Sequence, residues 1–280
     1  MTPNSAPNRP ELLSPAGSEE CMYAAVENGA DAVYFGLATP YNFNARRRAE
    51  NIPLEKLDDT LNFLHRRGVK GYLALNTLIY FDELPLVELL LREVIAAQID
   101  AVIVQDIGVA RLARRLCPEL PLHASTQMSL TSADAIGFAA TLGIRRVVLP
   151  RELSIKQIAE LRRTTNVELE CFVHGALCIS YSGQCYASLG LGGRSANRGC
   201  CAQPCRLPYS SQKTGTVQTD SERKPILSPH DLAALPLLPK LMATGVHAFK
   251  IEGRLKPPEY VAVVTRIYRE AIDHFAGAGT

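Results

Sequence analysis

The feature that most constrains the fold is a repeated alternation of a short apolar strand and an amphipathic helix, which begins at residue 11. Helical segments such as 54–67, 84–98 and 155–163 carry apolar residues at three-to-four spacing. Eight strand-and-helix units in about 270 residues predict a (β/α)8 TIM-like barrel, in which the last strand closes on the first. The predicted strands are 11–14, 32–36, 71–77, 101–105, 122–125, 146–150, 169–174 and 248–252.

The alternative architecture is an open, doubly wound sheet. Such a sheet does not need eight units, and no G-x-G-x-x-G follows the first predicted strand. We therefore expect one barrel domain over 11–280, preceded by a disordered tail at 1–10 that is rich in Pro and Asn.

The alternation is interrupted after the seventh strand by a cysteine-rich insertion at about 175–245. Insertions of this size are usually functional. Within it, the polar segment 210–224 predicts a hairpin, 225–230 a short strand, and 232–243 the helix that precedes the eighth strand.

Five of the eight cysteines lie between Cys178 and Cys205. Cys178, Cys185, Cys201 and Cys205 have the spacing C-x6-C-x15-C-x3-C in a glycine-rich segment, which suits four thiolates around one metal site. Neighbouring side chains diverge, so Cys200 and Cys201 cannot easily both face one centre. We favour Cys201, because its short spacing to Cys205 can close a small chelate loop.

Other uses of these cysteines remain open. A structural zinc site prefers paired C-x2-4-C spacings, which only Cys201 and Cys205 approach, whereas an iron-sulfur cluster tolerates irregular spacing because its thiolates bind separate irons. Disulfides need an oxidising compartment, and the N-terminus has no apolar run of signal-peptide length, so we expect a cytoplasmic location. Inert buried thiols do not cluster in this way.

Polar side chains gather where the predicted strands end, which is where barrel enzymes place their chemistry. A polar pocket explains them better than an apolar core does, because unpaired polar groups are costly to bury. On the seventh strand, Glu170 and His174 are expected to point inward together. For His123, a hydrogen-bonded interior histidine is the alternative. The candidate catalytic residues are His123, Glu170, His174, Lys250 and Glu252, and the candidate substrate-binding residues are Arg46, Asn76, Gln105, Gln127, Arg151 and Arg254.

The segment CFVHGALCISYSGQCYASLGLGGRSANRGCCAQPCRLPY resembles the signature of the collagenase-like peptidase family U32. ELLSPAGS, GADAVYFG, LNTLIYFDEL, AVIVQDIGV, LHASTQMS, VVLPREL and AFKIEGRLK resemble further blocks of that family in the same order, so the resemblance covers nearly the whole chain. It is strongest to the branch that hydroxylates a cytidine of large-subunit ribosomal RNA. Two features depart from the pattern, since Cys200 stands where a non-cysteine is expected, and the larger relatives continue beyond the position of Thr280.

The resemblance implies an oxygen-sensitive [4Fe-4S] cluster on cysteines of the signature segment, with prephenate as the source of the hydroxyl group. A dicarboxylate of this kind needs paired cations, and Arg151, Arg254 and Arg46 are the candidates, because guanidinium groups bind carboxylates with two parallel hydrogen bonds. The alternative is that Arg151 with Glu152, or Glu252 with Arg254, form structural ion pairs at the barrel rim.

The sequence therefore favours an oxygen-independent hydroxylase that acts on a pyrimidine in ribosomal or transfer RNA. The net charge of +2 gives no strong overall field for RNA, so recognition would depend on local patches such as 46–48. No apolar run of membrane-spanning length occurs. The alternatives are a collagenase-like peptidase, a subunit of an anaerobic quinone hydroxylase that works with a partner subunit, and an RNA-binding scaffold stapled by zinc.

Overall fold

Eight parallel strands form a closed barrel, which confirms the predicted fold. The computed structural model describes residues 9–41, 43–209 and 224–277. The sheet closes because β8 pairs with β9 and β11 pairs with β1. The barrel strands are β1 (Glu11–Ala16), β2 (Ala32–Phe35), β5 (Lys70–Leu75), β6 (Ala101–Val104), β7 (Leu122–Ala124), β8 (Ile144–Val148), β9 (Glu168–Gly175) and β11 (Ala248–Ile251).

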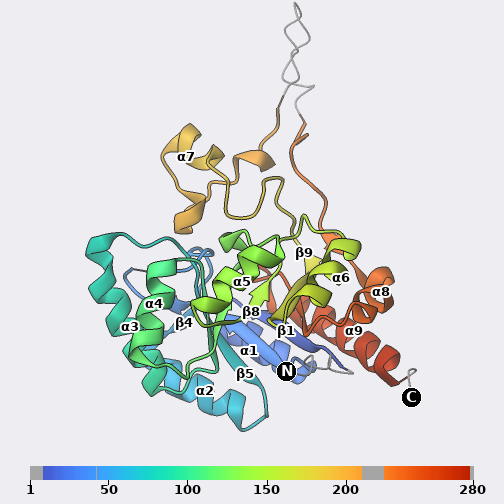
Figure 1. Cartoon of the computed structure of the whole chain (residues 1–280), viewed down its shortest axis with the longest axis horizontal. Coiled ribbons are helices and arrows are strands. Elements are labelled where there is room, and N and C mark those ends of the chain that lie inside the picture. The colour runs from blue at the N-terminus through green and yellow to red at the C-terminus, as the bar shows by residue number, and fades with distance from the viewer. Residues whose placement is uncertain (1–8, 42, 210–223, 278–280) are drawn as a thin grey trace, which may run out of the picture.

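Helices surround the barrel on its outer side (Figure 1). They are α1 (Glu19–Glu27), α2 (Leu57–His65), α3 (Leu84–Ala96), α4 (Ile107–Leu116), α5 (Ala133–Thr141), α6 (Ile155–Thr164), α8 (Leu238–Ala243) and α9 (Pro258–Gly277). Several begin at a side chain that accepts a backbone N–H. Ser154, for example, caps α6 in a reciprocal box with Gln157. None of the described helices is long and apolar enough to cross a membrane.

Short elements complete the connections between strands and helices. Two-residue strands β3 (Leu37–Ala38) and β4 (Ile52–Pro53) pair with each other and bracket the loop that carries Arg46. The 3-10 turns are η1 (Leu54–Lys56), η2 (Phe81–Glu83), η3 (Thr126–Met128), η4 (Ala196–Arg198), η5 (Pro204–Arg206) and η7 (Leu235–Leu237).

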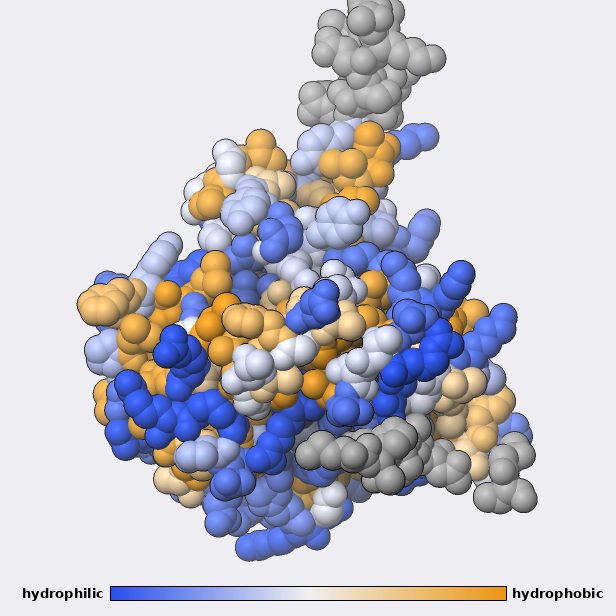
Figure 2. Space-filling view, in the orientation of Figure 1, coloured by the Kyte–Doolittle hydropathy of each residue, from blue (hydrophilic) through white to orange (hydrophobic). Residues whose placement is uncertain are grey.

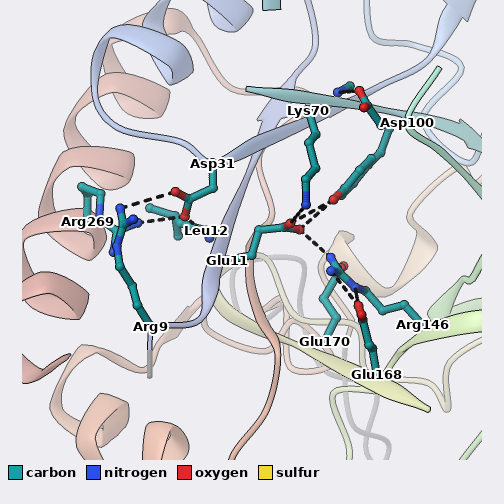
Figure 3. A network of polar contacts seen from close by, with 12 residues as sticks. Arg9, Glu11, Leu12, Asp31, Lys70, Asp100, Arg146, Glu168, Glu170 and Arg269 are labelled. Carbon is teal, nitrogen blue, oxygen red and sulfur yellow. Dashed lines mark hydrogen bonds and ion pairs between the residues drawn. The ribbon is translucent and has the colours of Figure 1, made fainter. Parts of the chain in front are cut away.

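The barrel interior is unusually polar for a fold of this type. The main apolar core lies between the strands and the helices, and a smaller apolar group occupies the interior. Beneath that group, Arg146 is almost fully buried and forms ion pairs with Glu11, Glu168 and Glu170 (Figure 3). Tyr72 donates a hydrogen bond of 2.9 Å to Glu11. Paired charges thus fill the amino-terminal end of the barrel, where buried charges require partners.

Residues 176–209, which form the first part of the long connection between β9 and β11, lie above the barrel on the side away from α2 (Figure 1). They contain the cysteine-rich segment and the short helix α7 (Ala187–Gly192). Tyr209 and Lys224 form an isolated antiparallel bridge. The hairpin predicted for 210–224 otherwise lies outside the described residues.

Two local predictions in this connection are wrong. No strand forms at 225–230. The helix predicted for 232–243 begins instead as a strand, β10 (Leu232–Ala233), which pairs antiparallel with β9. Helical structure starts only at η7 and α8, each of which has a proline in its first turn, namely Pro236 and Pro239. Proline lacks the N–H that a helix interior needs but fits a first turn, so it delays the start of the helix.

Candidate active site

A cavity of about 470 Å³ lies between the carboxyl ends of the barrel strands and the insertion. Side chains from β2, β5, β6, β8, β9 and β11 line its lower part, and the cysteine-rich segment lines its upper part. Its size and position are those expected for a small-molecule site in a barrel. Some of the candidate site residues line this cavity and others do not.

Four of the five clustered cysteines line the cavity, and they are the four chosen from the spacing. Cys178, Cys185, Cys201 and Cys205 border it, whereas Cys200 does not. The Cys200 thiol lies 3.4 Å from Nη1 of Arg47 instead. Burial raises the pKa of Cys205, and the nearby thiols of the other three cysteines raise it further. A bound cation would favour the thiolate form of Cys205 against this raised pKa.

The donor set must also fit the size of the metal group. A single zinc ion holds each thiolate at about 2.3 Å, which requires four sulfurs within a few ångströms of one another. Among the described residues, no group of three or more His, Cys, Asp or Glu side chains is gathered closely enough for a metal ion. A cluster places its thiolates on separate irons and therefore needs a wider arrangement. Thiols are the donors that both a zinc ion and an iron-sulfur cluster use, so the four cavity cysteines fit either group by donor type.

Glu252 lies between two of the predicted arginines. Its carboxylate is 2.9 Å from Nη2 of Arg151 and 3.5 Å from Nε of Arg46. Burial alone would raise the pKa of Glu252, but Arg46, Arg151 and Arg254 hold it at about 2. The ring of Phe172 lies 3.6 Å from the guanidinium carbon of Arg151. Arg151 therefore pairs with Glu252 across the cavity rather than with its sequence neighbour Glu152.

Arg254 is a buried cation in the same cavity, and it forms no ion pair with any described carboxylate. Its side chain donates a 3.2 Å hydrogen bond to Oδ1 of Asn44, and the residue is 4% exposed. Burial and the charge of Arg46 lower the pKa of Arg254 to about 10, although Tyr34 and Glu252 raise it in part. The group stays charged at neutral pH, so the lower cavity holds more positive than negative charge. An anionic ligand would supply the missing charge.

Lys250 forms the floor of the cavity. Its Nζ is 2.9 Å from Oε1 of Glu170, which is fully buried below it, and 4.3 Å from the centre of the Tyr34 ring. Burial lowers the pKa of Lys250, whereas Glu170 raises it. Arg146 approaches the other oxygen of Glu170, at 3.4 Å. The charge of Lys250 is thus balanced from beneath, while that of Arg254 is not.

Three further candidates do not border the cavity. Glu170 lies under its floor, and Gln105 and His123 are buried elsewhere in the barrel. His123 packs edge-on against Tyr72, with ring centroids 4.9 Å apart. Burial and the charges of Arg146 and Lys250 hold its pKa well below the ordinary value. Its Nδ1 has no hydrogen-bond partner among the described residues, so the alternative of a hydrogen-bonded interior histidine is incomplete.

The prediction that His174 points inward with Glu170 is wrong. The β9–β11 register shifts at this point, since Lys250 pairs with Phe172 and Ile251 pairs with His174. This irregularity reverses the alternation, and a one-residue slip moves a side chain to the opposite face of a sheet. The imidazole accordingly packs outside the barrel, where its Nδ1 lies 3.4 Å from the hydroxyl of Tyr268 in α9.

The remaining candidates line the cavity, and sequence reasoning missed several of their neighbours. Asn76 and Gln127 border the cavity together with the charged residues described above. Tyr34 and Phe172 were not predicted, although Phe172 shares the parity of Glu170 on β9 and could have been found from it. The tyrosines Tyr181 and Tyr186 in the insertion were also missed, because no periodic pattern places that segment.

The insertion is fastened to the barrel mouth by polar contacts. Glu152 accepts hydrogen bonds from the backbone N–H and the hydroxyl of Ser182, at 2.8 and 3.0 Å. Gly183 has a φ of +76°, and a Cβ at this position would lie 2.2 Å from the backbone oxygen of Gln127. Only glycine fits so close an approach in this conformation. These contacts hold the cysteine-rich segment over the arginines.

Comparison with known proteins agrees with this architecture. The family model for Peptidase family U32 matches residues 17–280. The chain belongs to this family. A solved U32 peptidase superposes with a TM-score of 0.56 at 12% identity, covering 89% of this chain and 94% of that one. At this identity the likeness shows the fold.

Relatives of this chain are named for two different activities, RNA hydroxylation and collagen cleavage. The chain is 41% identical to a 23S rRNA 5-hydroxycytidine synthase of Escherichia coli, 38% to a collagenase of Porphyromonas gingivalis and 36% to a tRNA hydroxylation protein of Bacillus subtilis. Each alignment covers 95% of this chain, but only 40%, 66% and 64% of the respective relative. The chain thus spans less than two thirds of the length of these relatives.

Proposed function

We propose that the protein is an iron-sulfur-dependent, oxygen-independent hydroxylase of a pyrimidine in RNA. The observation that carries the proposal is the shared cavity, in which four thiols from the insertion face a group of arginines from the barrel. Two of the relatives are named for hydroxylation of ribosomal or transfer RNA. An RNA substrate also agrees with the cytoplasmic location expected from the sequence.

The four cavity cysteines, Cys178, Cys185, Cys201 and Cys205, would hold a [4Fe-4S] cluster. When bound, such a cluster supplies either an electron relay or a Lewis-acidic iron. The chain itself contributes a partly closed site, whose upper wall carries the thiols and whose lower wall carries the cations.

The hydroxyl source is proposed to be prephenate or a similar dicarboxylate, bound by the lower wall. Arg254 lacks a carboxylate partner and offers a planar guanidinium for one carboxylate. Arg46 and Arg151, which share Glu252, are placed to receive a second carboxylate. Asn76 and Gln127 add neutral hydrogen-bonding groups to the same cavity.

The first test is the metal content of protein purified without oxygen. We expect about four irons and four acid-labile sulfides per chain, with a visible absorbance that fades in air. Cys205→Ser should lose this absorbance. Cys200→Ser is the matched control and should keep it, because Cys200 lies outside the cavity. With prephenate and unmodified RNA, mass spectrometry should then detect the gain of one oxygen atom on a pyrimidine.

Zinc without iron would contradict the hydroxylase and favour the zinc-stapled scaffold. An intact cluster that leaves RNA unmodified but supports quinone hydroxylation with a partner subunit would favour the quinone alternative. In either case the RNA proposal fails.

A collagenase-like peptidase is the second candidate, supported by the name of the Porphyromonas gingivalis relative. The residues that line this cavity support peptide-bond hydrolysis less well than they support the binding of a cluster and an anion. Among the described lining residues there is no histidine to activate a cysteine or serine nucleophile. His174, the candidate nearest in sequence to Cys178, faces α9 instead.

A further inference from the structure

The upper rim of the cavity exposes large side chains that proteins usually bury. Tyr181 is 73% exposed, Tyr186 62%, Leu191 73% and Ile179 57%, and all four border the cavity. We call this set the rim. Figure 2 shows apolar side chains gathered on the part of the insertion that carries α7. Exposed apolar groups that cluster at the mouth of a cavity mark a binding surface.

The segment that carries the rim is basic. Within the insertion, residues 176–209 and 224–230 contain no aspartate or glutamate, although Asp231 follows them directly and Glu152 binds Ser182 beside the rim. They do contain Arg194, Arg198, Arg206 and Lys224, of which only Arg198 pairs with a described carboxylate, that of Glu83. Arg194 is exposed beside α7. A surface that combines aromatic rings with an exposed guanidinium group, that of Arg194, matches the two parts of a nucleic acid strand, its bases and its phosphates.

We propose that the rim is the docking platform for single-stranded RNA, on which Tyr181 and Tyr186 stack against bases next to the target pyrimidine. This inference rests on the proposed RNA hydroxylase function. The target base would leave its own stack and enter the cavity between the cysteines and the arginines, because chemistry on a base requires access to its ring. Arg194, which is exposed, would face a phosphate.

Stacking reads the face of a base and not its hydrogen-bonding edge. The rim therefore supplies affinity that is tolerant of sequence, and it favours unpaired over double-stranded RNA. The rim is also separate in role from the lower wall, since its residues come from the insertion and the arginines come from the barrel. Loss of the tyrosines should therefore weaken RNA binding without changing the binding of a small dicarboxylate.

The test measures binding of a fluorescein-labelled, single-stranded RNA oligonucleotide to the anaerobically purified protein by fluorescence anisotropy. Tyr181→Ala and Tyr186→Ala should each weaken binding about tenfold, whereas Tyr181→Phe and Tyr186→Phe should stay within about twofold, because phenylalanine keeps the ring. Tyr23→Ala is the matched control, since Tyr23 is 44% exposed but lies on α1, away from the cavity. Iron content and prephenate binding should be equal in all these variants.

The result for each variant either supports or overturns the assignment of the rim as an RNA platform. If the wild-type protein binds the RNA and the alanine variants bind it equally well, the rim inference is wrong while the proposed function stands. If the wild-type protein binds no RNA, both fail together. If the alanine variants lose affinity for denatured collagen and keep it for RNA, the rim is a peptide site, which also overturns the inference.

Discussion

Replacement of Arg254 by methionine should stabilise the folded protein, although substitutions of buried residues usually destabilise. Burial lowers the pKa of Arg254 from 12.5 to about 10. Because the folded-state pKa lies below the ordinary value, the charged guanidinium destabilises the folded state at every pH below about 10. At about 1.4 kcal/mol per pH unit, this difference corresponds to about 3 kcal/mol.

The gain will be smaller than this value, because methionine cannot replace the hydrogen bond to Asn44, which contributes about 1 kcal/mol. We therefore expect Arg254→Met to raise the free energy of unfolding by about 1 to 2 kcal/mol. A residue that destabilises its own fold is retained for another reason, and here that reason is the binding of an anion.

Arg146→Met provides the matched control. Arg146 is equally buried but forms ion pairs with Glu11, Glu168 and Glu170. Its removal takes a buried cation from three carboxylates, and among the described residues Glu11 then keeps only Lys70 and Glu170 keeps only Lys250 as an ion-pair partner. Breaking a buried ion-pair network of this kind costs about 3 to 5 kcal/mol. The two substitutions are chemically the same, yet their effects on stability should have opposite signs.

The assay is urea unfolding at pH 7, followed by circular dichroism, on anaerobic samples of equal iron content. Added prephenate should shift the midpoint of the wild-type protein upward and leave that of Arg254→Met unchanged, because a ligand stabilises only a state that it binds. If Arg254→Met destabilises the protein by more than about 1 kcal/mol, the guanidinium is a structural group and our account of an unpaired cation is refuted.

Two further predictions concern Glu252 and Gly183. The pKa of Glu252, about 2 against an ordinary 4.5, means that its ion pairs with Arg46 and Arg151 stabilise the fold above about pH 4.5 and are lost as the pH falls toward 2. Glu252→Gln should therefore flatten stability between these pH values in acid titrations, and an unchanged slope would contradict the assignment. Gly183→Ala should reduce iron retention severalfold while the barrel still unfolds within a few degrees of wild type in thermal scans, because the added Cβ meets a barrel backbone oxygen. The control is Gly190→Ala, where a Cβ meets nothing within 4 Å, and equal iron in both variants would exclude this role for Gly183.

The barrel could be predicted because its signal is repeated. Each of the eight strands is a short apolar run followed by a helical period, and a single misjudged boundary does not change the count. The polar strand ends were informative for the same reason, since Asn76, Arg151 and Glu252 follow different strands but meet at one mouth. The choice of Cys201 over Cys200 followed from the divergence of neighbouring side chains, and the cavity contains the former and not the latter.

The wrong or missing site predictions fall where the regular strand-and-helix repeat ends. His174 follows the expected alternation in sequence, but the shifted pairing of β9 with β11 turns it outward, and no local pattern reveals a register shift between strands that are distant in sequence. Gln105 ends a strand as Asn76 does, yet it does not reach the cavity. Tyr181 and Tyr186 lie in a segment without periodicity, so only its folded path over the barrel shows that they border the cavity.

The paired charges at the amino-terminal end of the barrel also determine from which side a ligand can reach the cavity. Tyr72, Arg146 and Glu170 are almost fully buried beneath Lys250 and close the amino-terminal end of the barrel. Among the described residues, a ligand therefore reaches the arginines through the opening beneath the insertion. An RNA strand on the rim would cover the same opening. A small anion would therefore have to enter before the RNA strand docks, and its product would leave after the strand dissociates.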